Sequence, residues 1–183
     1  TKEIFPPFEG REEANLILGT DLLEHPEKTE GANNIVIVGG GVVGCETAHW
    51  LANEYGKNVT VLEMLPHFMM GVCTANRGHL LHYLEKSGVR LYNCTKVKAL
   101  AKDGVYVEQN QSQTVPDPYN TWQPLLPPNI PNPMEKAIKE EIVEKKIPAD
   151  LIVLAMGGKA DETFFFEAGE EHLAKEIYNI GDS

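Results

Sequence analysis

The stretch NNIVIVGGGVVG, residues 33–44, decides the fold of this chain. It begins with an apolar, β-branched run at residues 35–38, which is the composition of a parallel strand buried on both faces. Glycines then follow at Gly39, Gly41 and Gly44 in the spacing G-x-G-x-x-G. In such a turn the first glycine permits the tight bend, the second lets the backbone approach a pyrophosphate, and the third lets a helix pack close to the strand. The stretch therefore predicts a strand–turn–helix unit that binds a dinucleotide.

The residues after the turn strengthen this prediction. Residues 45–55 carry small and apolar side chains at helical spacing, and Gly56 stands where that helix would end. A helix that begins at the turn directs free N–H groups and the positive end of its dipole at the phosphates. Residues 58–62 return to a β-branched run, and Glu63 closes it 24 positions after Gly39. This is close to the offset of roughly 20 residues at which an acid hydrogen-bonds a ribose 2′-hydroxyl.

Glu63 also indicates which nucleotide is preferred. A carboxylate repels a 2′-phosphate, and the residues that follow, Met64, Leu65 and Pro66, supply no cation to hold one. The sequence thus favours NAD(H) over NADP(H). The predicted cofactor-binding residues of this unit are Gly39, Gly40, Gly41, Val42, Val43, Gly44 and Glu63. A P-loop is excluded because no G-K-[ST] follows the turn, which leaves an ordinary glycine turn beside a surface glutamate as the alternative.

Composition limits the classes of function. The chain has 183 residues and a net charge of −11, which argues against a nucleic-acid partner because such partners usually need a basic face. No apolar run approaches the roughly 20 residues of a membrane span, and the first residues lack the apolar core of a signal peptide. We therefore expect a soluble, cytoplasmic protein without a membrane partner. Cys45, Cys73 and Cys94 form no C-x-x-C, so neither a disulfide framework nor a dithiol centre is expected, and Cys45 is interpreted as a packing residue.

Further elements continue the α/β pattern. Residues 75–86 predict a helix and residues 89–92 a third strand, which completes a βαβαβ unit. Residues 96–101 and 105–108 flank an Asp-Gly pair, a strong signal for a hairpin, so a small antiparallel excursion is expected after the third strand. The expected fold is Rossmann-like, with a central parallel sheet and helices.

The remaining segments are less regular. Residues 1–30 are expected to be a partly extended lead-in with one short helix near residues 21–24. Residues 134–146 are compatible with either a helix or a strand. Residues 151–155 predict a buried strand, and residues 176–180 a final strand.

Two sets of side chains carry alternative interpretations. The proline-rich stretch at residues 110–133 is predicted to be a long loop in which Tyr119 and Trp122 pin the loop to its own domain rather than cover a ligand. His79 and His82 fall at i and i+3 on the predicted second helix, a spacing that can ligate a metal. Without a third ligand in view, we interpret them as part of a solvated helix face and predict no metal site.

Four segments together resemble a known family: residues 35–48, 59–63, 149–157 and 178–182 are similar to the pyridine-nucleotide domain of flavin oxidoreductases that bind two dinucleotides. Their order and the variant Cys45-Glu46-Thr47 most resemble the multidomain NADH:flavin oxidoreductases of the old yellow enzyme type, which include 2-enoate and 2,4-dienoyl-CoA reductases. The resemblance implies an NAD domain inserted within an FAD domain, together with a barrel that binds FMN and a 4Fe-4S cluster.

The resemblance also implies roles for individual residues. Glu46 matches a position that contacts the nicotinamide carboxamide, although a first-turn glutamate that stabilises the helix N-terminus is an equal alternative. Gly157 matches the turn that returns the chain to the FAD domain, and Asp182 matches an aspartate that contacts the FAD ribityl chain. Because the sequence contains no barrel, cluster cysteines or second fingerprint, we interpret residues 1–183 as one domain of a larger flavoenzyme. Its core is expected at residues 33–158, with flanks that adjoin the FAD domain.

The implied activity of the parent enzyme is hydride transfer from NADH to FAD and on to FMN, for reduction of an activated C=C bond in an enoate or a dienoyl-CoA ester. Its implied partners are the FAD domain and FMN barrel of the same chain, with residues 164–166 packing on the FAD domain, and a small-molecule or CoA-ester substrate. No catalytic residue is expected here, so the chain alone should be inactive. Two alternatives stay open: a structural ADP-binding module of the kind in trimethylamine dehydrogenase, and the NADH domain of another flavoprotein, such as an NADH oxidase or a ferredoxin or rubredoxin reductase.

Overall fold

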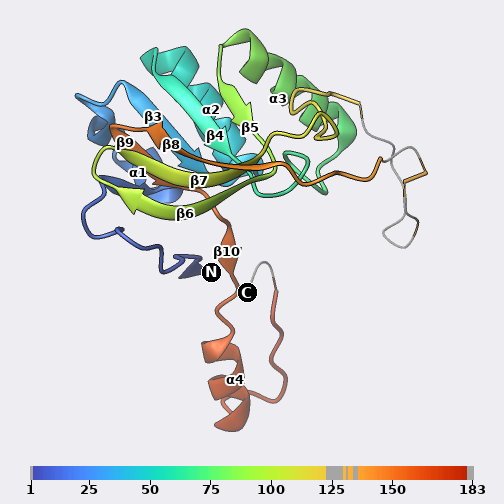
Figure 1. Ribbon diagram of the computed structural model, residues 1–183. Helices are drawn as coiled ribbons and strands as arrows, with labels where there is room; N and C mark the ends of the chain where they lie inside the picture. The colour runs from blue at the N-terminus through green and yellow to red at the C-terminus, as the bar shows by residue number, and fades with distance from the viewer. Residues whose placement is uncertain (1, 123–129, 131, 134–135, 181–183) are drawn as a thin grey trace.

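A five-stranded parallel sheet forms the centre of the structure (Figure 1). The computed structural model describes residues 2–122, 130, 132–133 and 136–180. Every neighbouring pair of strands in this sheet is parallel. In spatial order the strands are β2 (Leu16–Leu18), β9 (Leu151–Leu154), β3 (Asn34–Val38), β4 (Asn58–Leu62) and β5 (Arg90–Tyr92). The predicted α/β fold with a central parallel sheet is confirmed.

Different layers cover the two faces of the sheet. Helices α1 (Gly19–Glu24), α2 (Val42–Tyr55) and α3 (Thr74–Lys86) share one hydrophobic core with the sheet. An antiparallel sheet of three strands shares a second core with the opposite face. Its strands are β6 (Thr95–Ala101), β7 (Gly104–Asn110) and β8 (Ile142–Pro148).

Strand β3 explains why the sequence of the central sheet is apolar without alternation. Ile35 and Ile37 point into the core beneath the helices, whereas Val36 and Val38 point into the core beneath the antiparallel sheet. All four side chains are almost completely buried. Because alternate residues of a strand face opposite sides of a sheet, a strand covered on both faces must be apolar throughout. This burial fixes the strand that leads into the glycine turn.

Most predicted elements are present with small differences in their bounds. The βαβαβ unit runs through β3, α2, β4, α3 and β5, and the Asp-Gly hairpin joins β6 to β7. Of the undecided residues 134–146, residues 142–146 belong to strand β8, which pairs with β7 along its whole length, and residues 136–141 form neither a helix nor a strand. The lead-in contains the expected short helix and also strand β2, which pairs with β9 and extends the parallel sheet.

The final strand predicted at residues 176–180 is wrong. These residues form no strand, and within the described part of the chain no strand lies beside them to accept their hydrogen bonds. Tyr178 is 76% exposed and Ile180 is 83% exposed. A β-rich composition therefore does not make a strand where a pairing partner is lacking.

The C-terminal part of the chain stands apart from the layered sheets (Figure 1). It leaves the domain through β10 (Gly158–Lys159), which pairs with β1 (Lys2–Glu3), and continues into α4 (Thr163–Glu170). Phe164 is 75% exposed and Phe166 is 58% exposed on α4.

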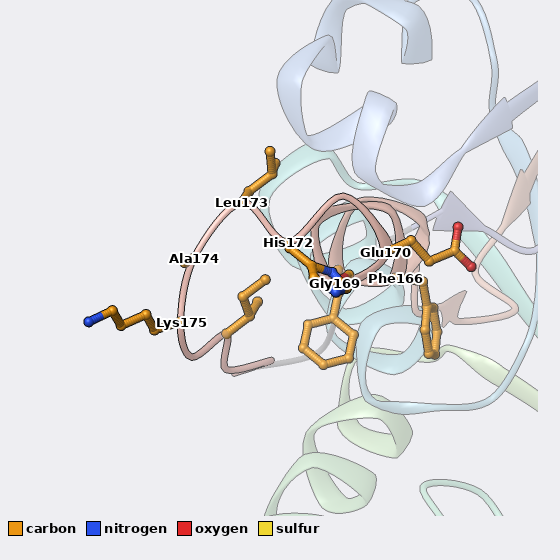
Figure 2. A pocket seen from close by; sticks show the side chains of 9 residues that line it. Phe166, Gly169, Glu170, His172, Leu173, Ala174 and Lys175 are labelled. Atoms are coloured by element: carbon orange, nitrogen blue, oxygen red, sulfur yellow. The ribbon is translucent and has the colours of Figure 1, made fainter.

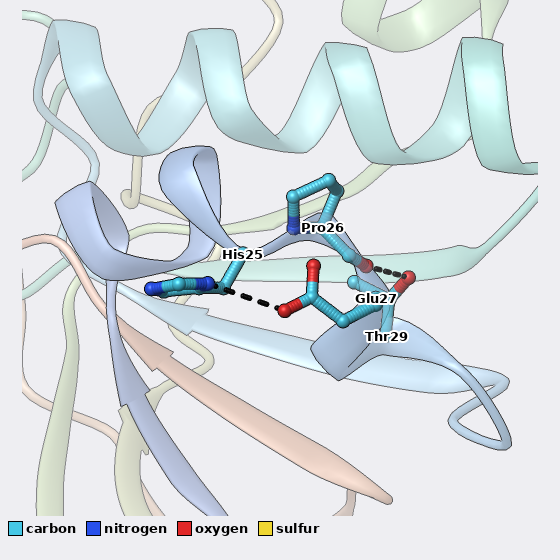
Figure 3. Close-up of polar contacts among 4 residues, drawn as sticks. All are labelled: His25, Pro26, Glu27 and Thr29. Carbon is cyan, nitrogen blue, oxygen red and sulfur yellow. Dashed lines mark hydrogen bonds and ion pairs between the residues drawn. The ribbon is translucent and has the colours of Figure 1, made fainter.

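Side-chain contacts hold the connection that leads into β3. Thr29 Oγ1 donates a hydrogen bond to the Pro26 carbonyl oxygen at 2.9 Å, and the Nδ1 atom of His25 lies 3.2 Å from Glu27 Oε1 (Figure 3). These contacts close the 3-10 turn η1 (Pro26–Thr29). Lys57 Nζ donates to the Thr29 carbonyl oxygen at 2.9 Å, so the turn after α2 is joined to the segment before β3.

The long loop is attached to the parallel sheet as predicted for Tyr119. Its hydroxyl donates to the Val89 carbonyl oxygen at 2.6 Å and accepts the Leu91 N–H at 3.1 Å. Trp122 is 59% exposed. Among the described helices, none combines the length and apolar character that a membrane span requires.

Candidate functional site

Three parallel strands end at one edge of the sheet, where a cavity of about 560 Å³ opens. Strands β3, β4 and β9 bring to this edge the glycine turn, Glu63 and Gly157. Ligands of open α/β sheets bind outside the carboxyl ends of the strands, which is where this cavity lies. Of the predicted residues, its lining contains Gly39, Gly41, Val42, Val43, Glu63 and Gly157.

A second, larger cavity lies in the C-terminal part. It measures about 960 Å³ and lies between α4 and the residues that follow, with Phe166 and Leu173 among the side chains around it (Figure 2). All of its lining comes from residues 165–177, at a distance in sequence from the glycine turn and Glu63. We place the nucleotide site in the smaller cavity because that cavity has the chemistry to bind phosphate and ribose.

The backbone of the turn agrees with the reasons given for each glycine. Gly39 has a φ of +115°, and a Cβ atom there would lie less than 3.0 Å from the Ala155 carbonyl oxygen. A Cβ atom at Gly44 would lie less than 3.0 Å from the Gly39 carbonyl oxygen. At Gly41, by contrast, an added Cβ meets no described atom within 4 Å. The turn and the helix packing thus need Gly39 and Gly44, whereas Gly41 faces open space.

The N-terminus of α2 supplies the hydrogen-bond donors at this open space. The helix starts at Val42 with Gly41 as its N-cap, and no described side chain caps it. Its first N–H groups are therefore available to an anion, and the helix dipole favours negative charge there. The open cradle at Gly41 and these free donors fit a dinucleotide pyrophosphate.

Glu63 is fixed in place by the backbone on both sides of it. Its Oε2 atom accepts the Gly40 N–H at 2.8 Å, and its Oε1 atom accepts the Leu65 N–H at 2.8 Å. A carboxylate offers about four lone-pair positions, so these two bonds leave acceptor capacity for ribose hydroxyls. The carboxylate is thus pre-oriented beside the glycine turn.

Arg77, a buried arginine that was not predicted from the sequence, supports the glycine turn through Phe68. Arg77 is 2% exposed, and its Nε atom donates to the Phe68 carbonyl oxygen at 2.9 Å. Phe68 packs so closely on Gly40 that a Cβ atom at Gly40 would lie less than 3.0 Å from its ring, and the Met69 N–H donates to the Gly40 carbonyl oxygen at 2.8 Å. Arg77 Nη1 also donates to the Asn120 carbonyl oxygen at 3.0 Å. The Arg77 side chain thus connects Phe68, which packs on the glycine turn, to Asn120 in the long loop.

Cys45 behaves as the packing residue that the sequence suggests. It is fully buried, and its Sγ atom lies 3.6 Å from the Gly40 carbonyl oxygen. Burial first, and the nearby Glu63 carboxylate second, raise the pKa of the thiol to about 12. The thiol therefore stays protonated at neutral pH and is a poor nucleophile.

The other predicted residues lie in different places. Glu46 is exposed and is the fifth residue of α2, which begins at Val42. The interpretation of Glu46 as a first-turn residue is therefore wrong, and the described lining of the cavity does not contain it. Gly157 has a φ of +82° and lines the cavity. Asp182 lies outside the described residues.

The histidines on α3 pack around an aromatic ring. His79 and His82, joined by His49 from α2, lie with their ring centroids 4.7 to 5.7 Å from that of Tyr83. Among the described residues, no group of three or more His, Cys, Asp or Glu side chains is placed to hold a metal ion.

The fold and this cavity define a dinucleotide-binding α/β domain. The sequence matches the family described as pyridine nucleotide-disulphide oxidoreductase over residues 3–179, and the chain belongs to this family. Its members bind FAD and a nicotinamide nucleotide and are oxidoreductases.

Individual relatives are much longer proteins. The chain is 34% identical over 110 residues to a bilirubin reductase of Mediterraneibacter gnavus, which covers 60% of this chain and 17% of the relative. It is 32% identical over 91 residues to an NADH oxidase of Thermoanaerobacter brockii, covering 49% of this chain and 14% of the relative. Among solved structures, a 2-naphthoyl-CoA reductase in complex with 2-naphthoyl-CoA superimposes with a TM-score of 0.71 at 25% identity, covering 99% of this chain and 22% of that one. The chain thus spans less than a quarter of each.

Proposed function

We propose that this chain is the NADH-binding domain of a multidomain flavin oxidoreductase. In the parent enzyme it delivers NADH so that hydride passes to FAD and on to FMN, for reduction of an activated C=C bond in an enoate or a CoA ester. The observation that carries this proposal is the placement of Gly41, the free α2 N-terminus and Glu63 around one cavity. The names of the relatives support it, since they include reductases of bilirubin and of 2-naphthoyl-CoA.

Each part of the site has one task in this proposal. The turn from Gly39 to Gly44 holds the pyrophosphate, Glu63 accepts hydrogen bonds from the adenosine ribose, and Gly157 lines the path toward the FAD side. Glu46 orients the nicotinamide carboxamide. The bound nicotinamide supplies the hydride, so this chain needs no acid, base or nucleophile of its own. FAD, FMN and the 4Fe-4S cluster belong to other parts of the parent, with Asp182 and the exposed phenylalanines of α4 on the FAD side.

Titration of the purified chain with NADH, NADPH and ADP tests the nucleotide assignment. We expect NADH to bind more tightly than ADP, and Glu63→Gln to weaken NADH binding by roughly tenfold, because a hydrogen bond to a charged acceptor contributes about 1.5–3 kcal/mol. Calorimetry measures both. Equal affinities for NADH and ADP would contradict the proposal and would favour a structural ADP-binding module.

A second candidate is the NADH domain of an NADH oxidase, which the similarity to the Thermoanaerobacter brockii protein favours. The two candidates share this domain and differ in the final electron acceptor. Assays of the intact parent with NADH, using either dioxygen or an α,β-unsaturated acid as acceptor, separate them. Faster NADH consumption with dioxygen than with any unsaturated acid would select the oxidase.

The isolated chain is expected to bind NADH without oxidising it. The bound nucleotide needs a flavin to accept the hydride, and the described residues that line the cavity provide no redox group. The measurement is NADH-dependent reduction of a dye by the purified, flavin-free chain. Turnover above that of a heat-denatured control would show that the assignment of a binding role alone is wrong.

A further inference from the structure

One cation lines the nucleotide cavity and has no role in the function proposed above. Lys96 is exposed at the start of β6 and contributes to the cavity together with Glu63. Its side chain forms no hydrogen bond or ion pair with any described residue, although its charge contributes to the lowered pKa of Glu108. The carboxylate opposite it in the sheet register, Glu108, is instead bonded to Lys98 Nζ at 2.7 Å. A lysine whose ammonium group is hydrogen-bonded to no described residue, in a cavity that is suited to phosphate, is positioned to bind an anion.

The backbone places Lys96 on the Glu63 side of the cavity. The Thr95 N–H donates to the Glu63 carbonyl oxygen at 2.8 Å, and the Cys94 N–H donates to the Leu65 carbonyl oxygen at 3.1 Å. The segment that carries Lys96 therefore runs beside the segment that carries Glu63. In this fold the pyrophosphate lies at the helix N-terminus, and the ribose 2′ position lies at the acid that ends the second strand. Lys96 thus lies at the part of the cavity where the 2′ position of the adenosine ribose would bind.

We propose that Lys96 binds the 2′-phosphate of NADPH, so that this site accepts NADPH as a second coenzyme beside NADH. The inference rests on the proposed nucleotide-binding function. Glu63 disfavours a 2′-phosphate, and Lys96 offsets that repulsion. The three residues after Glu63 supply no cation, but β6, the strand that follows β5, brings Lys96 to the cavity.

Two pairs of probes isolate the contact. The probes 5′-AMP and 2′,5′-ADP differ only by the 2′-phosphate, as do NADH and NADPH. We expect the full 183-residue chain to bind NADPH within roughly tenfold of NADH. Lys96→Met should weaken binding of 2′,5′-ADP and NADPH by roughly five- to tenfold and leave 5′-AMP and NADH unchanged, as expected for loss of one charge-assisted hydrogen bond.

A neighbouring lysine provides the matched control. Lys98 lies on the same strand, is exposed, and lines a different cavity from the nucleotide site. Lys98→Met removes the same charge from the same strand, so it should leave the ratio of the NADPH and NADH dissociation constants unchanged. Both variants alter exposed side chains and should unfold at nearly the temperature of the unmodified chain.

Each result has one meaning. If Lys96→Met leaves the ratio of the NADPH and NADH dissociation constants unchanged, the proposal is overturned. The same holds if Lys98→Met changes this ratio equally, because the effect would then come from positive charge on the strand in general and not from contact with Lys96. Equal weakening of NADH and NADPH by Lys96→Met would place Lys96 on the pyrophosphate and would also overturn it. If the unmodified chain fails to bind NADH, the proposed function fails. The 5′-AMP and 2′,5′-ADP pair then still decides the role of Lys96, and a failure of both to bind would reject it.

Discussion

Gly44→Ala is expected to destabilise the domain strongly, whereas Gly41→Ala is expected to keep its stability and to lose nucleotide affinity. The new Cβ atom at Gly44 would lie less than 3.0 Å from the Gly39 carbonyl oxygen, which is backbone and cannot rotate away. Overpacking of a buried site costs about 1–3 kcal/mol and occasionally more. Because this contact forces α2 away from the turn, we expect a loss of at least about 3 kcal/mol from a total stability on the order of 5–15 kcal/mol.

Gly41→Ala is the matched change for this test. Its φ of −72° and ψ of −173° suit any residue, and the new Cβ atom would meet no described atom within 4 Å. The cost to folding should be about 1 kcal/mol or less, the difference between glycine and alanine at an N-cap. The methyl group instead occupies the space that a pyrophosphate needs, so NADH binding should weaken at least roughly tenfold.

Thermal unfolding followed by circular dichroism, together with NADH titration, separates the two effects. A Gly44→Ala protein with an unchanged midpoint would mean that α2 is not held against the turn by this contact. A Gly41→Ala protein with full NADH affinity would mean that the pyrophosphate does not approach this backbone, and the assignment of the cavity would then be wrong.

The sequence predicted the turn and its neighbours because their signals are local. An all-apolar strand, three spaced glycines and a helix lie within residues 34–55, so each residue's role follows from its near neighbours. Strand β2 was not predicted, since three residues in a charged lead-in become a strand only by pairing with β9, far away in sequence. The wrong strand at residues 176–180 shows the converse, because composition favoured a strand but no strand among the described residues pairs with this segment.

The residues of the candidate site likewise fall into those with a local sequence signal and those without one. Gly41 and Glu63 were predicted from their spacing, but Lys96 and Arg77 were not, since both reach the site through tertiary contacts. Arginine is rarely buried, so a sequence gives no reason to place one beneath a glycine turn.

Arg77→Met is expected to destabilise the domain by about 2–4 kcal/mol, since each buried acceptor left without a donor costs about 1–3 kcal/mol. Methionine keeps most of the apolar stem but leaves the Phe68 and Asn120 carbonyl oxygens without their donor. Arg77 is 2% exposed and its bond to the Phe68 carbonyl oxygen is buried, so water replaces that bond poorly. The unfolding midpoint in urea measures the loss.

Arg77→Met should also weaken nucleotide binding, in addition to lowering the global stability. Phe68 lies against Gly40, so a displaced Phe68 loosens the turn, and amide exchange near residues 68–69 and 119–121 should accelerate more than in the strands. Arg90→Met, at an exposed arginine on β5, is the control and should change stability by no more than about 0.5 kcal/mol. If both variants unfold at the same urea concentration, Arg77 does not support the turn. If only Arg77→Met is destabilised and its NADH affinity also falls, the glycine turn depends on a side chain that connects it to the long loop.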